Sequence, residues 1–162
     1  MPEIYPKLWR FALSLSGDKP GADDLAQTVA LRALENAGKF QPGSSLNAWL
    51  FTMTRRVWLN EKRAERIRGA GALGSGNLDD LPTPGLDTET NIRAREVLSQ
   101  VMALPEAQRA TVLLVYVEGH RYAEAADILG IPIGTVMSRL AKLVFNEVHA
   151  TKGNLLSSIL IA

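Results

Sequence analysis

The sequence predicts an all-α protein made of two small helical domains that a flexible linker joins. Three observations lead to this prediction. Apolar residues recur at helical spacing on both sides of residues 69–91, no segment alternates polar and apolar residues as a strand does, and residues 69–91 are themselves rich in Gly and Pro. The 162 residues leave room for two such domains. We therefore expect domains over residues 1–68 and 92–150, followed by an apolar tail over residues 151–162.

Three helices are predicted in the first domain. The first covers residues 4–16, and the second covers residues 22–38, with Asp23 and Asp24 in its first turn, where the helix dipole favours acidic groups. A Pro-Gly-Ser-Ser turn whose serines suit a helix cap then leads into a long helix over residues 46–68.

Two tryptophans of this long helix receive different expectations. Trp49 lies among apolar residues, so we expect it in the core. Trp58 lies among basic residues, where an aromatic ring can also stack on an unpaired base.

The second domain is predicted to be helical throughout. Its expected helices cover residues 92–103, 105–118, 122–129 and 133–150, with a tight turn at Gly130 before the last one.

The net charge of +1 hides an uneven distribution. Residues 1–68 carry eleven basic and seven acidic side chains, whereas residues 69–91 carry four acidic side chains and none that is basic. Basic residues are concentrated late in the first domain, at Arg55, Arg56, Lys62, Arg63, Arg66 and Arg68. Such a stretch suits a phosphate backbone, although a solvated helix face with ion pairs explains it equally well.

The composition excludes several classes of function. The chain has no Cys and only two His, which excludes disulfides and thiolate zinc sites and leaves almost nothing for histidine chemistry. We find no paired acid and base or metal-ligand cluster, so we predict a protein that is not an enzyme and needs no cofactor or metal. No apolar run approaches the length of a membrane helix and no signal peptide is visible, which predicts a cytoplasmic protein without membrane insertion.

Residues 122–143 form the sharpest local pattern and predict a helix-turn-helix. Ala126 is small where two helices cross, and Gly130 provides the left-handed turn. A shared core is expected from Ile128, Leu129, Ile131, Val136 and Leu140. The side chains expected to project toward a DNA groove are Thr135, Ser138, Arg139 and Lys142. An ordinary helical hairpin is the alternative interpretation.

The chain as a whole resembles the extracytoplasmic-function (ECF) group of bacterial sigma-70 family factors. Three stretches carry the resemblance: residues 8–33 with the motif Ala-Asp-Asp-Leu-Ala-Gln, residues 39–53 with Lys-Phe-Gln-Pro-Gly, and residues 104–140 with Gly-Ile-Pro-Ile-Gly-Thr-Val. The resemblance implies a factor that directs core RNA polymerase to promoters, reading and melting the −10 element with the first domain and reading the −35 element with the second.

The resemblance also implies a role for particular residues. Those expected at the −10 element, beside duplex DNA and the melted non-template strand, are Lys39, Gln41, Pro42, Gly43, Ser44, Ser45, Asn47, Arg55, Arg56, Trp58, Lys62 and Arg63. Those expected at the −35 element are Tyr122, Thr135, Met137, Ser138, Arg139 and Lys142. Those expected to bind core polymerase are Asp23, Asp24, Gln27 and Arg32.

Regulation by a partner is a further implication, because members of this family are commonly held inactive by an anti-sigma factor. We expect a compact inhibited state whose two domains separate in the polymerase complex. Two alternatives remain from the residues themselves: a stand-alone helix-turn-helix regulator and an adaptor that binds only proteins. The basic, Trp-bearing helix argues against the first, and the polar side chains of the last helix argue against the second.

Overall fold

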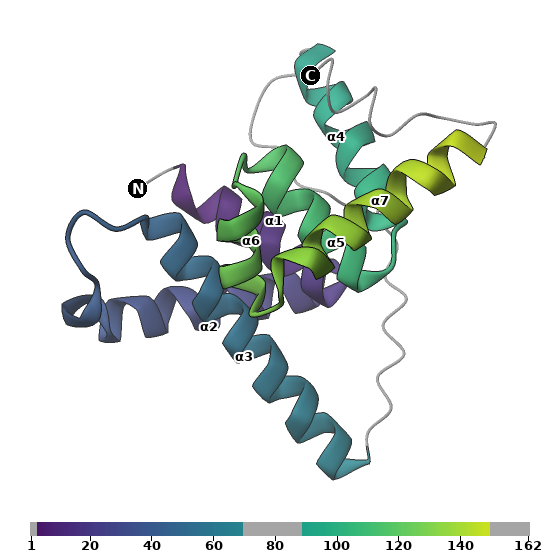
Figure 1. Ribbon diagram of the computed structural model, residues 1–162. Coiled ribbons are helices and arrows are strands. Elements are labelled where there is room, and N and C mark those ends of the chain that lie inside the picture. The colour runs from purple at the N-terminus through teal and green to yellow at the C-terminus, as the bar shows by residue number, and fades with distance from the viewer. Residues whose placement is uncertain (1–2, 70–88, 150–162) are drawn as a thin grey trace.

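The structure, a computed structural model, describes residues 3–69 and 89–149, and every regular element in these ranges is a helix. The N-terminal part contains α1 (Ile4–Ser16), α2 (Lys19–Glu35), the short 3-10 helix η1 (Ala37–Lys39) and α3 (Leu46–Arg68). The C-terminal part contains α4 (Glu89–Met102), α5 (Glu106–Val112), the π-helix η3 (Leu113–Val117), α6 (Tyr122–Leu129) and α7 (Ile133–His149) (Figure 1). The all-α prediction is confirmed. Nearly all of the predicted linker and the whole tail over residues 151–162 lie outside the described residues.

The start of α2 differs from the prediction. Asp18 caps the helix by accepting a hydrogen bond of 2.7 Å from the backbone N–H of Gly21, and Pro20 occupies the first turn. This combination begins the helix at Lys19, because proline fits the first turn and an aspartate cap satisfies a free N–H. Asp23 and Asp24 therefore lie beyond the first turn, and the prediction that they stabilise the helix start is wrong.

The helix expected over residues 105–118 is also modified. Its last five residues, Leu113–Val117, form a π-helix, in which the N–H of Glu118 donates to the carbonyl oxygen of Leu113 at 2.9 Å. The five consecutive residues from Ala110 to Leu114 are all buried, because other helices surround this stretch on every side.

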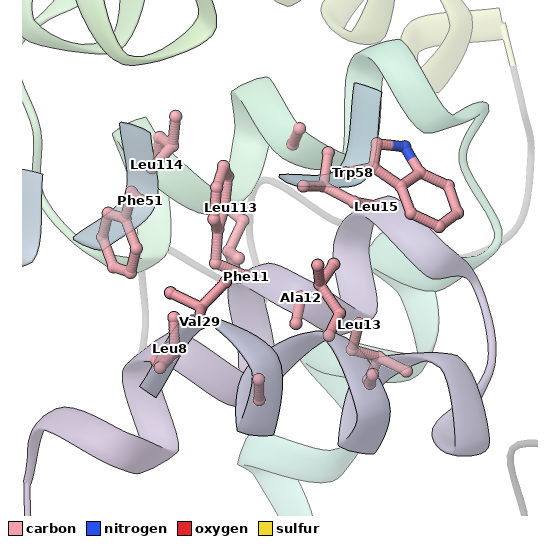
Figure 2. Close-up of a cluster of buried hydrophobic side chains, with 14 of the residues drawn as sticks. Leu8, Phe11, Ala12, Leu13, Leu15, Val29, Phe51, Trp58, Leu113 and Leu114 are labelled. Atoms are coloured by element: carbon pink, nitrogen blue, oxygen red, sulfur yellow. The ribbon is translucent and has the colours of Figure 1, made fainter. Parts of the chain in front are cut away.

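One hydrophobic core joins the N-terminal and C-terminal parts. Helix α1 packs against α2, α3 and α5, and α3 also packs against α6. Phe11 of α1 lies against Phe51 of α3, with 4.8 Å between the ring centroids, and Leu113 and Leu114 complete the same cluster from the C-terminal part (Figure 2). Burial of this apolar surface holds the two parts together in the structure.

A second cluster lies within the C-terminal part and packs α7 onto α5 and α6. It is formed by Val101, Val112, Ala126, Val136, Leu140 and Leu143. The single core predicted for the helix-turn-helix is thus divided, because Ile128 and Leu129 belong to the larger cluster that also holds α1 and α3. Within residues 3–69 and 89–149, no helix combines the length and the apolar composition that a membrane crossing requires.

Candidate nucleic-acid and polymerase surfaces

The loop that precedes α3 forms an ordered and exposed turn. Ser44 donates from its hydroxyl to the carbonyl oxygen of Gln41 at 2.7 Å, and Gly43 adopts a positive φ of 89° with open space where a Cβ would lie. Ser45 accepts a hydrogen bond of 3.2 Å from the N–H of Ala48 and so caps α3, as its predicted role requires. The turn leaves the predicted loop residues Gln41, Pro42, Gly43, Ser44 and Ser45 accessible to a ligand.

The remaining predicted residues around this loop are engaged in local contacts or are partly buried. Lys39 donates to the side-chain oxygen of Asn36 at 2.7 Å, and Asn47 is half-buried in the first turn of α3. Trp49 is half-buried against Phe40 rather than enclosed, with 5.4 Å between the ring centroids. The Trp49 ring thus packs against the residue that directly precedes the loop.

The basic side chains of α3 fall on two faces of the helix. Arg56 and Arg63 are exposed and, being seven residues apart, lie on the same face. Lys62 lies 4.4 Å above the ring of Trp58 and pairs with Glu65 at 3.1 Å, whereas Arg55 is half-buried near α6. Of the three arginines of α3 predicted at the −10 element, Arg56 and Arg63 are therefore the two that are exposed to solvent.

Trp58 is a core residue in this conformation. Only 8% of its surface is exposed, and its indole N–H donates to a carboxylate oxygen of Glu106 at 3.1 Å. The predicted stacking of Trp58 on an unpaired base requires that this contact with the C-terminal part be released.

Of the predicted polymerase-binding residues of α2, one is half-buried and bonded to α1, and the others form an exposed surface. Asp23 accepts a hydrogen bond of 2.7 Å from the indole N–H of Trp9 and so links α2 to α1. Asp24, Gln27 and Arg32 are exposed on the outer side of the helix.

Two leucines accompany these polar residues. Leu31 and Leu34 are 63% and 75% exposed, although large apolar side chains usually lie inside. This apolar pair, which the site prediction did not include, is typical of a surface that another protein covers.

The helix-turn-helix of α6 and α7 has the turn that the sequence predicts. Gly130 adopts φ 59° and closes α6 with backbone hydrogen bonds to its last carbonyl groups. At the start of α6, Glu124 accepts a hydrogen bond of 2.9 Å from the N–H of Arg121, and this bond lowers the pKa of the Glu124 carboxyl. Both ends of α6 are therefore fixed by local contacts.

The predicted −35 residues differ in how they are placed. Tyr122, Met137, Ser138 and Lys142 are exposed, and Thr135 is half-buried. The guanidinium of Arg139 lies against α5, with Nη1 at 3.4 Å from the carbonyl oxygen of Ala107 and at 3.5 Å from the hydroxyl of Thr111. Arg139 thus does not project outward as predicted, because α5 offers it two acceptors.

Polar contacts between the two parts surround the shared core. Arg10 donates to a carboxylate oxygen of Glu118 through Nε at 3.0 Å and through Nη2 at 2.6 Å, and the Glu118 side chain is only 3% exposed. Arg109 donates from Nε to the carbonyl oxygen of Ser14 at 2.8 Å. These partners are about a hundred residues apart along the chain, and no motif or spacing in the sequence marks them.

Two arginines assigned to different promoter elements approach each other at this interface. Arg55 of α3 lies against Gly130, burial lowers its pKa, and the positive charge of Arg139 lowers the pKa further. Repulsion between the positive charges of Arg55 and Arg139 therefore disfavours the contact between the two parts at this point.

Gly130 also provides a test of the turn. An added Cβ at Gly130 would lie 2.9 Å from Nη1 of Arg55, on a backbone that side chains disfavour. We expect Gly130→Ala to lower the free energy of unfolding by about 1–2 kcal/mol, measured by urea denaturation. Gly134→Ala is the matched control, because no atom lies within 4 Å of its added Cβ and alanine favours the helix. Equal losses in the two variants would contradict the assigned turn.

Comparison with known proteins identifies the family. The model of Sigma-70 region 2 matches residues 3–67, and the model of Sigma-70 region 4 matches residues 94–143. The ECF RNA polymerase sigma factor EcfG of Rhodopseudomonas palustris is 40% identical over 135 residues, which cover 83% of this chain and 74% of that protein. The chain belongs to the ECF group of sigma-70 factors.

Other relatives agree with this assignment. The ECF RNA polymerase sigma factor SigL of Mycobacterium tuberculosis is 35% identical over 138 residues, covering 82% of this chain and 76% of that one. The sigma factor RpoE of Bartonella quintana, solved in complex with the anti-sigma factor NepR, superposes with a TM-score of 0.68 and 28% identity and covers 87% of each chain. As a sigma factor the protein is not an enzyme, and it serves promoter recognition by RNA polymerase through its region 2 and region 4.

Proposed function

We propose that residues 3–69 of this sigma factor bind core polymerase and read and open the −10 element, and that residues 89–149 read the −35 element. The observation that carries the −10 assignment is the exposed turn at residues 41–45, which lies at the capped end of the helix that also presents Arg56 and Arg63. A small-residue turn beside positive charge suits single-stranded DNA.

The turn is suited to receive an unpaired base. Gly43 has no side chain and nothing within 4 Å of its missing Cβ, so a nucleotide can approach the backbone closely. The hydroxyl groups of Ser44 and Ser45 lie beside it on the exposed turn. Binding of one base here would stabilise the opened strand, because the cost of unpairing it is repaid by these contacts.

Polymerase binding is assigned to the outer face of α2. Asp24, Gln27 and Arg32 offer polar partners there, and Leu31 and Leu34 offer apolar area that binding removes from water. Asp23 contributes by fixing α2 on α1 through Trp9.

The −35 element is assigned to the exposed side of the helix-turn-helix. Thr135, Met137, Ser138 and Lys142 lie on α7 and Tyr122 lies at the start of α6. Arg139 supports this surface by tying α7 to α5.

The closed arrangement of the two regions supports a regulatory role for their contact. Trp58 and Arg55 cannot reach DNA while Glu106 and Gly130 lie against them, so the regions must separate on the promoter. The complex of the Bartonella relative with NepR supports an anti-sigma factor as a partner that favours such an arrangement. We place the protein in the cytoplasm, where a bacterial cell keeps its polymerase and promoters.

The −10 assignment is tested with the two exposed arginines. We expect Arg56→Ala/Arg63→Ala to weaken open-complex formation with core polymerase and to reduce the slope of log affinity against log salt by about 2, one for each lost phosphate contact. Binding to core polymerase should be unchanged, since the assigned face lies on α2. Lys19→Ala at the start of α2 is the control for loss of a positive charge elsewhere. An unchanged salt slope in the double variant would refute the assignment.

A further inference from the structure

We propose that Met137 is a specificity-determining residue that selects a thymine in the −35 element by contact with the thymine methyl group. The inference rests on the proposed reading of this element by α7. The observation behind the inference is that the exposed surface of α7 has fewer unengaged polar side chains than the sequence predicts.

Met137 lies in the first turns of α7 with 51% of its surface exposed. Ile133, one turn earlier, is 46% exposed and lies on the same face. Neither side chain belongs to the hydrophobic clusters of the described residues, in which Val136 and Leu140 hold α7 in place. The start of α7 therefore presents apolar surface at the position where a helix-turn-helix meets base edges.

The polar neighbours of Met137 have limited capacity to read bases. The hydroxyl of Ser138 donates to the carbonyl oxygen of Thr135 at 3.0 Å, so in this arrangement only its oxygen lone pairs are left for a base. The guanidinium of Arg139 is held by α5. Lys142 is exposed, but its ammonium is a flexible point charge that suits a phosphate better than a base edge.

Thymine is the base whose major-groove edge matches an apolar side chain. It presents a methyl group on C5, whereas the other three bases present only hydrogen-bonding groups or a bare C–H there. The thioether of methionine is flexible and polarizable, so it can cover this methyl group without exact placement. Contact between the two would remove both from water and favour a thymine at one position.

The test uses the full chain bound to core polymerase. The −35 element is first selected from a randomised library with the parent protein, and each thymine is then replaced by deoxyuridine, which removes only the methyl group. We expect one replacement to weaken promoter binding about fourfold, the effect of one buried methyl group. With Met137→Ala, the same replacement should have no effect.

Val144→Ala is the matched control, because Val144 is an exposed apolar residue of the same helix, 42% exposed and two turns further on. This variant should keep the discrimination against deoxyuridine. The inference is overturned if no thymine shows the effect with the parent protein, if Met137→Ala keeps it, or if Val144→Ala loses it. If scrambling the whole −35 element leaves binding by the parent protein unchanged, the proposed function of α7 itself fails.

Discussion

Covalent locking of region 2 to region 4 should abolish promoter-directed transcription. The residues to replace are Arg10 and Glu118, whose side chains meet at 2.6 Å across the interface. The chain has no cysteine, so Arg10→Cys/Glu118→Cys offers exactly one pair of thiols to a bismaleimide that spans about the length of the two lost side chains. While the regions are held together, Trp58 stays covered by Glu106 and cannot reach the melted strand.

We expect the cross-linked protein to give no more transcript than core polymerase alone in a run-off assay. The same double variant treated with a monofunctional maleimide controls for loss of the ion pair, and it should retain activity. Each single-cysteine variant, treated with the bismaleimide, controls for modification at one position. If the cross-linked and the monofunctionally treated proteins transcribe equally, the regions work without separating and the proposed opening is refuted.

Loss of the Phe11 ring should produce the largest change in stability. Phe11 is fully buried, lies against Phe51, and belongs to the cluster that joins both regions. Phe11→Ala removes a ring that packed neighbours cannot replace, so we expect the free energy of unfolding to fall by about 3–5 kcal/mol. That is a large fraction of the stability of an ordinary domain.

Urea denaturation followed by circular dichroism measures this change. Tyr5→Ala on the same helix is the control, because Tyr5 is exposed and its removal should cost little. Because the cluster is shared, we also expect the helices of region 2 and region 4 to unfold in one transition in Phe11→Ala, at a lower urea concentration than in the parent protein. A loss below about 0.5 kcal/mol, within the range of surface substitutions, would contradict a shared core.

Local chemistry explains what the sequence could predict. The bounds of α3 and α6 and the turn at Gly130 agree with the structure, because caps, helical periodicity and a glycine turn act over a few residues. The start of α2 was misplaced because Asp18 and Pro20 also form a good helix start.

The relation between the two regions could not be predicted in this way. Trp58 lies among basic residues in the sequence, yet its partner Glu106 is 48 positions away and comes from the other region. Similarly, Arg139 is expected to point outward because its position on α7 allows it, and only the position of α5 explains why its guanidinium lies against that helix. Such pairings depend on how helices meet in space, which periodicity along one helix does not encode.

The π-helix η3 lets this interface accommodate one extra residue in the chain. A π turn holds about one residue more than an α-helical turn, so the residues after it lie about 100° from where the same sequence would place them in a regular α-helix. Leu113 lies before that shift and Glu118 directly after it, so both reach region 2 from one continuous helix. If the same residues wound as a regular α-helix, Glu118 would turn by about 100° around the axis, away from Arg10. Removal of one residue between Leu113 and Glu118 would instead leave an α-helical turn with both residues on the same face, so we expect a chain one residue shorter here to keep the contact with Arg10.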